Sequence, residues 1–142
     1  MTVDVRLGLL RDRVIEGGIE FQVLRGRDGW RQIVNPRGGG GRVRYDGWRD
    51  VLTIESPQGS LRIQFRWRHT TFSWRGRTYR IVPSLSGMTI FREDDPVVKA
   101  RLTWSGVRLE TVDPEFGGIA QELALGLGYR AMTMAVATAA AV

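Results

Sequence analysis

Residues 61–82 read LRIQFRWRHTTFSWRGRTYRIV, and apolar and polar side chains alternate along most of this stretch. Alternation with a period of two is typical of a strand that buries one face. The stretch therefore predicts strands over Leu61–Trp67, Thr71–Trp74 and Thr78–Val82. Arg75-Gly76-Arg77 lies between the last two of these strands and is predicted to form a hairpin turn.

The same alternation continues on both sides, up to about residue 112. Further strands are predicted at Val3–Leu9, Ile19–Val23, Trp30–Val34, Arg42–Tyr45, Val51–Glu55, Met88–Arg92, Val98–Trp104 and Val107–Thr111. Turn residues separate them at Asp28-Gly29, Asp46-Gly47, Pro57-Gln58-Gly59, Ser86-Gly87 and Ser105-Gly106. Such a succession predicts an antiparallel meander, and closure protects its edges. We expect a mainly β fold, a closed antiparallel β-barrel of about 11–12 strands covering about residues 3–112.

The C-terminal segment has a different composition. Asp113-Pro114-Glu115 is typical of a helix start, with a capping residue, a proline in the first turn and an acid at the positive helix end. Gly117-Gly118 is a predicted break or hinge. From Leu123 the chain reads LALGLGYRAMTMAVATAAAV. Alanine, leucine and methionine favour helix, so we expect a helix over about residues 118–140.

Apolar side chains cover every side of this helix, so protein or lipid must surround it. Twenty residues of helix span about 30 Å, enough to cross a bilayer. Arg130, near the middle, makes crossing costly. We favour a central helix buried inside the barrel, with Arg130 at a barrel mouth or paired with an acid. Small residues would let the strands approach it: Ala124, Gly126, Gly128, Ala131, Ala135, Ala137, Ala139 and Ala140. A membrane anchor stays open as the alternative.

Few residues suit catalysis or metal binding. The chain has no cysteine and one histidine, His69, which we interpret as a turn residue. Asn35–Gly41 lacks the ending of a phosphate-binding loop and is predicted to be a hairpin tip. Glu93-Asp94-Asp95 is interpreted as a charged turn. We expect no enzyme activity, no cofactor, no metal and no small-molecule substrate. Met1–Gly17 lacks a signal-peptide core, so we expect one cytoplasmic, bacterial domain over residues 1–142.

Arginine and aromatic residues interleave in the opening stretch. By alternation, Arg62, Arg66 and Arg80 project opposite to the aromatics, which share a face with the aliphatic residues and are expected to be buried. Arginine forks suit phosphate oxygens. The anion-binding candidates are Arg62, Arg66, Arg68, Arg75, Arg77 and Arg80. The interleaved aromatics are Phe65, Trp67, Phe72, Trp74 and Tyr79. A solvated barrel face over a core is the simpler alternative.

Over residues 61–142 the chain resembles the tubby C-terminal-like superfamily, particularly its LURP-one-related and phospholipid scramblase-like branches. The resemblance rests on the strand pair Phe72–Ile81, the hairpin Met88–Ala100, two strands reaching Val112-Asp113 and the closing hydrophobic helix. It implies a closed antiparallel barrel of about twelve strands around a central C-terminal helix. Members of the superfamily include phosphoinositide-binding, membrane-tethered regulators and proteins named as scramblases.

The formal net charge of +6 favours anionic partners. We expect a non-catalytic tubby-like binding module that engages anionic phospholipid surfaces or a protein partner through its arginine-rich face. Peripheral attachment at the inner membrane face would follow. A nucleic acid-binding protein using the same face, and a C-terminally membrane-anchored β domain, are the alternatives.

Overall fold

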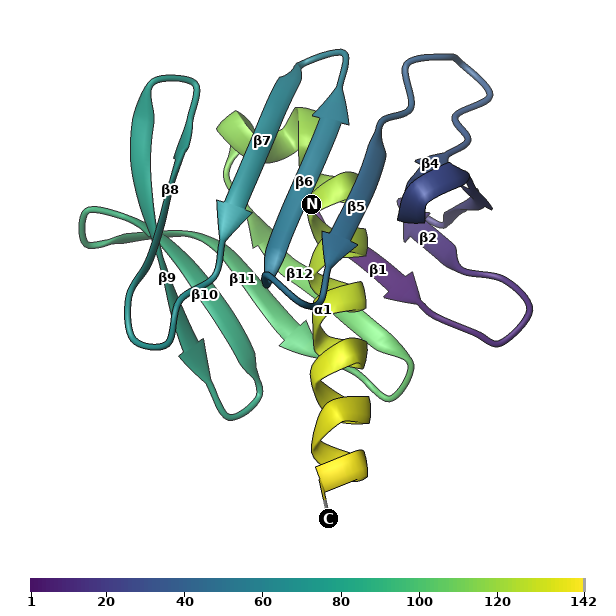
Figure 1. Cartoon of the computed structure of the whole chain (residues 1–142). Coiled ribbons are helices and arrows are strands. Elements are labelled where there is room, and N and C mark those ends of the chain that lie inside the picture. Colours follow the sequence, from purple (N-terminus) through teal and green to yellow (C-terminus); the bar gives the residue numbers. More distant parts are fainter. Residues whose placement is uncertain (142) are drawn as a thin grey trace.

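The computed structural model describes the backbone of residues 1–141 and the side chains of residues 1–140. Twelve strands form one antiparallel sheet with the order β7-β6-β5-β4-β3-β2-β1-β12-β11-β10-β9-β8 (Figure 1). The strands are β1 (Val3–Arg6), β2 (Arg13–Glu16), β3 (Ile19–Arg25), β4 (Arg31–Ile33), β5 (Arg42–Asp46), β6 (Val51–Ser56), β7 (Gly59–Gln64), β8 (Thr70–Trp74), β9 (Arg77–Ser84), β10 (Gly87–Arg92), β11 (Asp95–Leu102) and β12 (Gly106–Val112). A single 3₁₀ turn, η1 (Arg27–Gly29), lies between β3 and β4.

The sheet curls into a nearly closed barrel. Its centre is the pairing of β1 with β12, which joins the two halves of the meander. The edges are β7 and β8, consecutive strands that contact each other without forming a hydrogen-bonded ladder; in the connection between them the Arg66 backbone N–H donates to Thr70 Oγ1 at 2.9 Å. The predicted mainly β, antiparallel barrel is confirmed. The sequence prediction missed one strand, β2, whose four residues include one buried side chain.

Register explains which side chains fill the barrel. Val43 lies opposite Ile54, and Ile54 lies opposite Leu61, all three facing inward and buried. One residue along, Thr53 pairs with Arg62, whose side chain is exposed. The alternation read from the sequence thus separates core residues from surface residues. It also fixes the strand register, because a shift of one strand by one residue would move its apolar side chains to the outer face.

The C-terminal helix enters the barrel from one end. Asp113 caps the 3₁₀ helix η2 (Pro114–Ile119) by accepting from the Glu115 N–H at 3.2 Å, and η2 runs into α1 (Ala120–Ala141) without a break at Gly117-Gly118. The first turns of α1 are buried among the strands, with Leu123, Leu125 and Leu127 at most 1% exposed. The helical prediction and the buried first half are confirmed.

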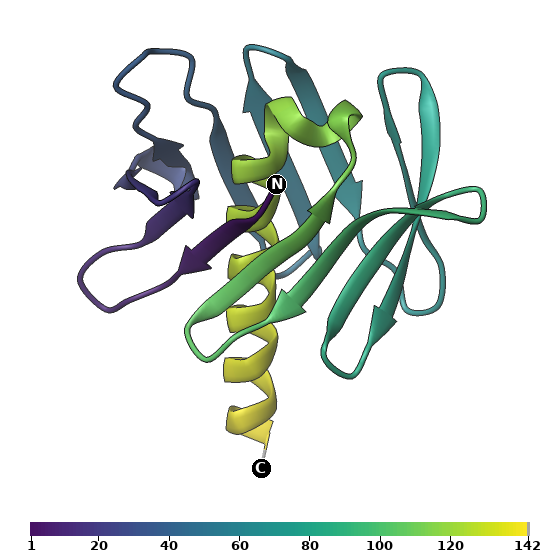
Figure 2. The ribbon, with the colours of Figure 1, turned by 180° about the vertical axis from the view of Figure 1, so that it is seen from behind.

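The second half of α1 leaves the barrel, as both ribbon views show (Figures 1 and 2). Met132, Met134 and Val136 are exposed, as are the alanines at 135, 137, 139 and 140. The expectation that the whole helix is buried was therefore wrong beyond Arg130. The reason is length: the 22-residue helix spans about 33 Å, whereas strands of three to eight residues reach at most about 27 Å and run obliquely.

Candidate functional site

The six arginines predicted to bind anions do not form one cluster. Arg66 and Arg68 lie in the loop between β7 and β8. Arg75 and Arg77 lie at the β8–β9 turn, at the opposite end of the barrel. Arg62 and Arg80 project from the outer surface of β7 and β9 between these ends, and all six side chains are exposed. The continuous arginine face read from the sequence is thus divided among three places.

At the β8–β9 turn the arginine charge is partly compensated. Glu115 accepts from Arg92 at 2.5 Å and lies 3.7 Å from Arg77. The Tyr79 hydroxyl also donates to this carboxylate, and burial together with that hydrogen bond raises the pKa of Tyr79 to about 12. Arg75 donates to Gln58 at 2.7 Å. This end of the barrel is tied together by polar contacts and offers less unpaired positive charge.

The aromatic residues of the same stretch differ in how far they are buried. Phe65, Phe72, Trp74 and Tyr79 are buried, as the alternation predicts. Trp67 is 92% exposed, which contradicts the expectation that it faces the core. The physical reason is that β7 ends at Gln64, so Trp67 lies in a loop and its position is no longer set by the pleat.

Loops alternate between the two ends of an antiparallel meander. Five of the loops at one end surround the point where α1 emerges, and we call this region the exit end (Figures 1 and 2). It consists of loops 7–12, 47–50, 65–69, 85–86 and 103–105. Loops 17–18, 34–41, 57–58, 75–76 and 93–94 form the opposite end.

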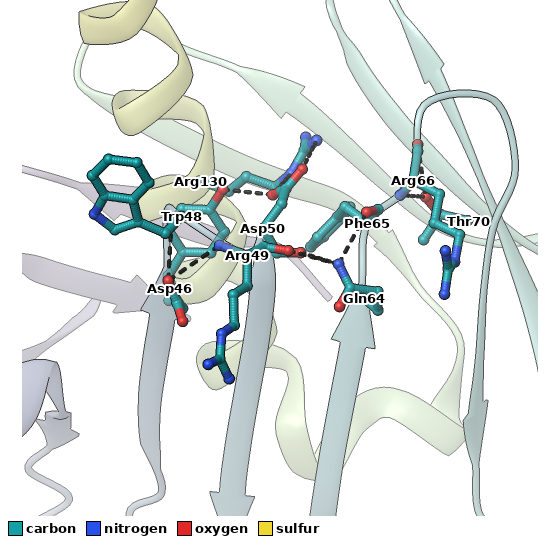
Figure 3. Close-up of polar contacts among 10 residues, drawn as sticks. Asp46, Trp48, Arg49, Asp50, Gln64, Phe65, Arg66, Thr70 and Arg130 are labelled. Carbon is teal, nitrogen blue, oxygen red and sulfur yellow. Dashed lines mark hydrogen bonds and ion pairs between the residues drawn. The ribbon is translucent and has the colours of Figure 1, made fainter.

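Specific contacts hold the emerging helix among the exit-end loops. Arg130 donates from Nε to Asp50 Oδ1 at 2.9 Å and from Nη2 to Oδ2 at 3.1 Å, as Figure 3 shows. Its guanidinium lies 4.0 Å from the centre of the Phe65 ring. The Tyr45 hydroxyl donates to Asp50 at 2.5 Å, and burial and this carboxylate raise the pKa of Tyr45. Arg130 was expected either at a barrel mouth or paired with an acid, and the structure shows both.

A second tyrosine fastens the helix from the other side. The Tyr129 hydroxyl donates to the buried carboxylate of Asp12, which also accepts from the Gly8 backbone N–H at 3.3 Å. Burial and the neighbouring carboxylate raise the pKa of Tyr129. Loop 7–12 and loop 47–50 are therefore both joined to α1 at the level of residues 129–130, and the segment beyond that level is presented to the outside.

Large apolar side chains project from the exit end. Six of them, which we call the apolar tips, are each more than nine-tenths exposed. They are Leu9, Leu10, Trp48, Trp67, Leu85 and Trp104, and all lie in the five exit-end loops. No loop residue of the opposite end is a large exposed hydrophobic in the described part of the chain. Isolated apolar residues on a surface are ordinary, but a gathering around an apolar helix marks an interaction surface.

The exit end also carries positive charge without acidic partners. Arg11, Arg49, Arg66 and Arg68 are exposed, and none of the ion pairs among residues 1–140 involves them. The acids nearby are engaged within the fold. Asp12 and Asp50 bind Tyr129 and Arg130, and Asp46 accepts from the backbone N–H groups of Trp48 and Arg49 at 3.0 and 3.3 Å. Asp12 and Asp46 keep their charge, but these four arginines and Arg130 outnumber the three aspartates, so the net charge of the exit end is positive.

The remaining sequence predictions concern loops. His69 is an exposed residue of loop 65–69, and Asn35–Gly41 belongs to the connection between β4 and β5, as expected of a hairpin tip. Glu93 and Asp94 form the turn between β10 and β11. Within the described residues, no group of three or more histidine, aspartate or glutamate side chains is placed to hold a metal ion.

Comparison of the chain with protein-family models, curated proteins and solved structures finds no match. One helical stretch, Pro114–Ala140, is long and apolar enough by length and composition to cross a membrane, and a third of its most apolar window is buried.

Proposed function

We propose that this chain is a non-catalytic binding module that docks on anionic phospholipid membranes through its exit end. The observation that carries the proposal is the gathering of the six apolar tips around the projecting half of α1. The order of the strands and the final helix fit the resemblance to the tubby-like superfamily, and we propose a tubby-like architecture on that basis.

The chemistry of the exit end suits a lipid–water boundary. Tryptophan concentrates at the interface of a bilayer, where its ring meets apolar chains and its N–H stays hydrated. Complete burial of one leucine side chain contributes about 1.5–3 kcal/mol. Each basic residue near an anionic membrane surface adds about 1 kcal/mol. The apolar tips and the unpaired arginines lie on the same end, so both favour binding of that end to an anionic membrane.

The projecting half of α1 determines the mode of insertion. Residues 131–141 are 11 residues of helix and reach about 16 Å, which is about half of a hydrocarbon core of about 30 Å. This described segment is suited to entering one leaflet. Crossing the bilayer with the preceding turns would pull Leu123, Leu125 and Leu127 out of the core, and emptying such a site costs about 2–5 kcal/mol per leucine. Membrane entry from one side, with the barrel intact, is the favoured form of anchoring.

A second candidate function is nucleic acid binding. Its specific support is that Trp67 is exposed between Arg66 and Arg68, an arrangement on which a base could stack beside bound phosphates. The apolar helix and Leu9, Leu10 and Leu85 have no role in that function. We therefore favour the membrane.

The test is co-sedimentation of the full chain with vesicles of phosphatidylglycerol and phosphatidylcholine, and with vesicles of phosphatidylcholine alone. We expect pelleting with the anionic vesicles, weakened but not abolished by high salt, because charge is screened and apolar insertion is not. No pelleting with either vesicle would overturn the proposal. A salt-steep gel shift on random DNA or RNA without vesicle binding would favour the second candidate.

Matched arginine variants distinguish the exit end from the outer barrel surface. Replacing Arg66 and Arg68 by glutamine removes two charges from the exit end, whereas replacing Arg62 and Arg80 removes two from the side of the barrel. The first pair should lower affinity for anionic vesicles by about 2 kcal/mol, a factor of about 30, and the second pair much less. Equal losses would show that the arginines act through overall charge instead of position.

A further inference from the structure

An apolar cleft of about 580 Å³ lies beside the emerging half of α1. One wall is a helix face made by Gly128, Ala131, Ala135 and Thr138. The facing wall is made by the ends of β9 to β12 and their loops, with Met88, Leu102 and Trp104, and by Leu7, which directly follows β1. Its size and its predominantly apolar lining are those of a binding cleft for an apolar ligand.

Small side chains create this cleft. Positions 128, 131, 135 and 138 are separated by three, four and three residues, so they form one stripe along the helix. Glycine, alanine and threonine on that stripe leave the space open, whereas the larger Met132 and Met134 border it. The cleft is a consequence of residue choice along one helix face.

The cleft has the dimensions and direction of a lipid chain in one leaflet. The ten steps along the helix from Gly128 to Thr138 rise about 15 Å, half of a hydrocarbon core of about 30 Å. In a docked molecule the Gly128 end lies at the barrel mouth, level with Arg130 and the exit-end loops, and the Thr138 end points toward the bilayer centre. Trp104 belongs both to the cleft wall and to the apolar tips, so the cleft is continuous with the docking surface.

We propose that this cleft holds one acyl chain of a membrane phospholipid when the protein is docked, with the headgroup at the barrel mouth and the chain along α1. The inference rests on the proposed membrane docking. The Gly128 end suits the uncharged ester-linked part of the lipid, next to the headgroup, because the guanidinium of Arg130, which lines this end, is already bonded to Asp50 through two of its nitrogens. The bound lipid would cover Ala135 and Thr138, the part of the stripe that the strands leave exposed.

The experiment measures chain immobilisation by electron spin resonance, using anionic vesicles that contain a phospholipid spin-labelled on its acyl chain. Ala135→Trp places an indole in the cleft, and Ser105→Trp does so from the opposite wall; Ala137→Trp adds the same side chain to the helix outside the cleft. These three positions are exposed, so the fold should tolerate the changes. Co-sedimentation of every variant is measured in parallel.

We expect the wild type and Ala137→Trp to give a motionally restricted lipid component, and Ala135→Trp and Ser105→Trp to lose it while still pelleting with vesicles. A restricted component that is unchanged in both cleft-filling variants, or absent from a wild type that pellets, would overturn the acyl-chain site and leave membrane docking intact. Failure of the wild type to pellet would overturn the docking proposal and this inference together.

Discussion

Arg130→Met is the change that best tests how the helix is fixed at the barrel mouth. Methionine keeps an unbranched side chain over the Phe65 ring but removes both hydrogen bonds to Asp50. Asp50 would keep the Tyr45 hydroxyl as a donor, so one charge would remain beside a partly buried tyrosine without its counter-ion. The loss should therefore appear in the free energy of unfolding.

The magnitude follows from exposure. Two hydrogen bonds to charged groups contribute about 1.5–3 kcal/mol each when well buried. The Arg130 and Asp50 side chains are 22% and 26% exposed, so water replaces part of what is lost. With the lost contact between guanidinium and ring, worth about 0.5–1 kcal/mol, we expect a total of about 2–3 kcal/mol. For a chain of this size that corresponds to a Tm lowered by roughly 10 °C.

Urea unfolding followed by circular dichroism measures this difference. Arg101→Met is the matched control, because the Arg101–Glu110 pair has an arginine that is 60% exposed and should cost at most about 0.5 kcal/mol. Asp50→Asn completes a double-mutant cycle, and asparagine tolerates the positive φ of 54° at this position. A loss for Arg130→Met no larger than that for Arg101→Met, or a cycle without coupling, would refute the reasoning.

Three further predictions concern buried polar groups and helix packing. Burial raises the pKa of Glu122, so this residue's contribution to stability is present below its unfolded pKa of about 4.3 and is lost as pH rises through the folded pKa. Relative to the wild type, Glu122→Gln should therefore be more stable at pH 7 than at pH 4 in urea unfolding. Parallel pH profiles of the two proteins would contradict this. All three tyrosines of the chain have raised pKa values, so absorbance at 295 nm should show no tyrosine ionisation in the folded protein at pH 10, and ionisation should begin only at higher pH, when the protein unfolds. Ionisation of the folded protein near pH 10 would disprove the hydroxyl–carboxylate contacts. Gly126→Ala would place a Cβ 2.3 Å from Leu52 Cδ1 and should destabilise by about 1–2 kcal/mol despite the better helix propensity of alanine. Gly128→Ala, with its Cβ 3.3 Å from Val5 Cγ1, should cost less. If thermal unfolding showed both variants to be equally stabilised, the helix would not be packed in the barrel as described.

Most of the barrel could be predicted because alternation and turn residues are local signals. Val43, Ile54 and Leu61 face the core because successive side chains of a strand point to opposite faces, and for the same reason their neighbours face outward. β2 escaped prediction because its apolar residues, Val14 and Ile15, are adjacent and so show no alternation. Trp67 and Trp104 were assigned to strands because alternation was continued beyond the strand ends, although an apolar side chain in a turn has no partner strand and no fixed face.

The candidate site could be predicted only in part. The apolar composition of α1 indicated that protein or lipid surrounds it. In the structure the first half of the helix is buried and the second half is exposed. The arginines were grouped by closeness in sequence, whereas the meander sends Arg66 and Arg75 to opposite ends. Loop alternation would have found the exit end only if β2 had been predicted, because Leu10 lies before β2 and its loop comes to the same end as those of Trp48 and Trp104 only when β2 is counted.

The most direct test of membrane docking uses the absence of native cysteine, which allows one environment-sensitive fluorophore to be attached at a chosen position. Leu85→Cys places it at an apolar tip of the exit end, and Arg37→Cys places it in loop 34–41 at the opposite end. On vesicles containing phosphatidylglycerol, we predict a blue-shifted emission and quenching by brominated lipid chains at position 85 and neither at position 37. Quenching at both positions, at position 37 alone, or at neither would contradict the proposal that the exit end enters the membrane.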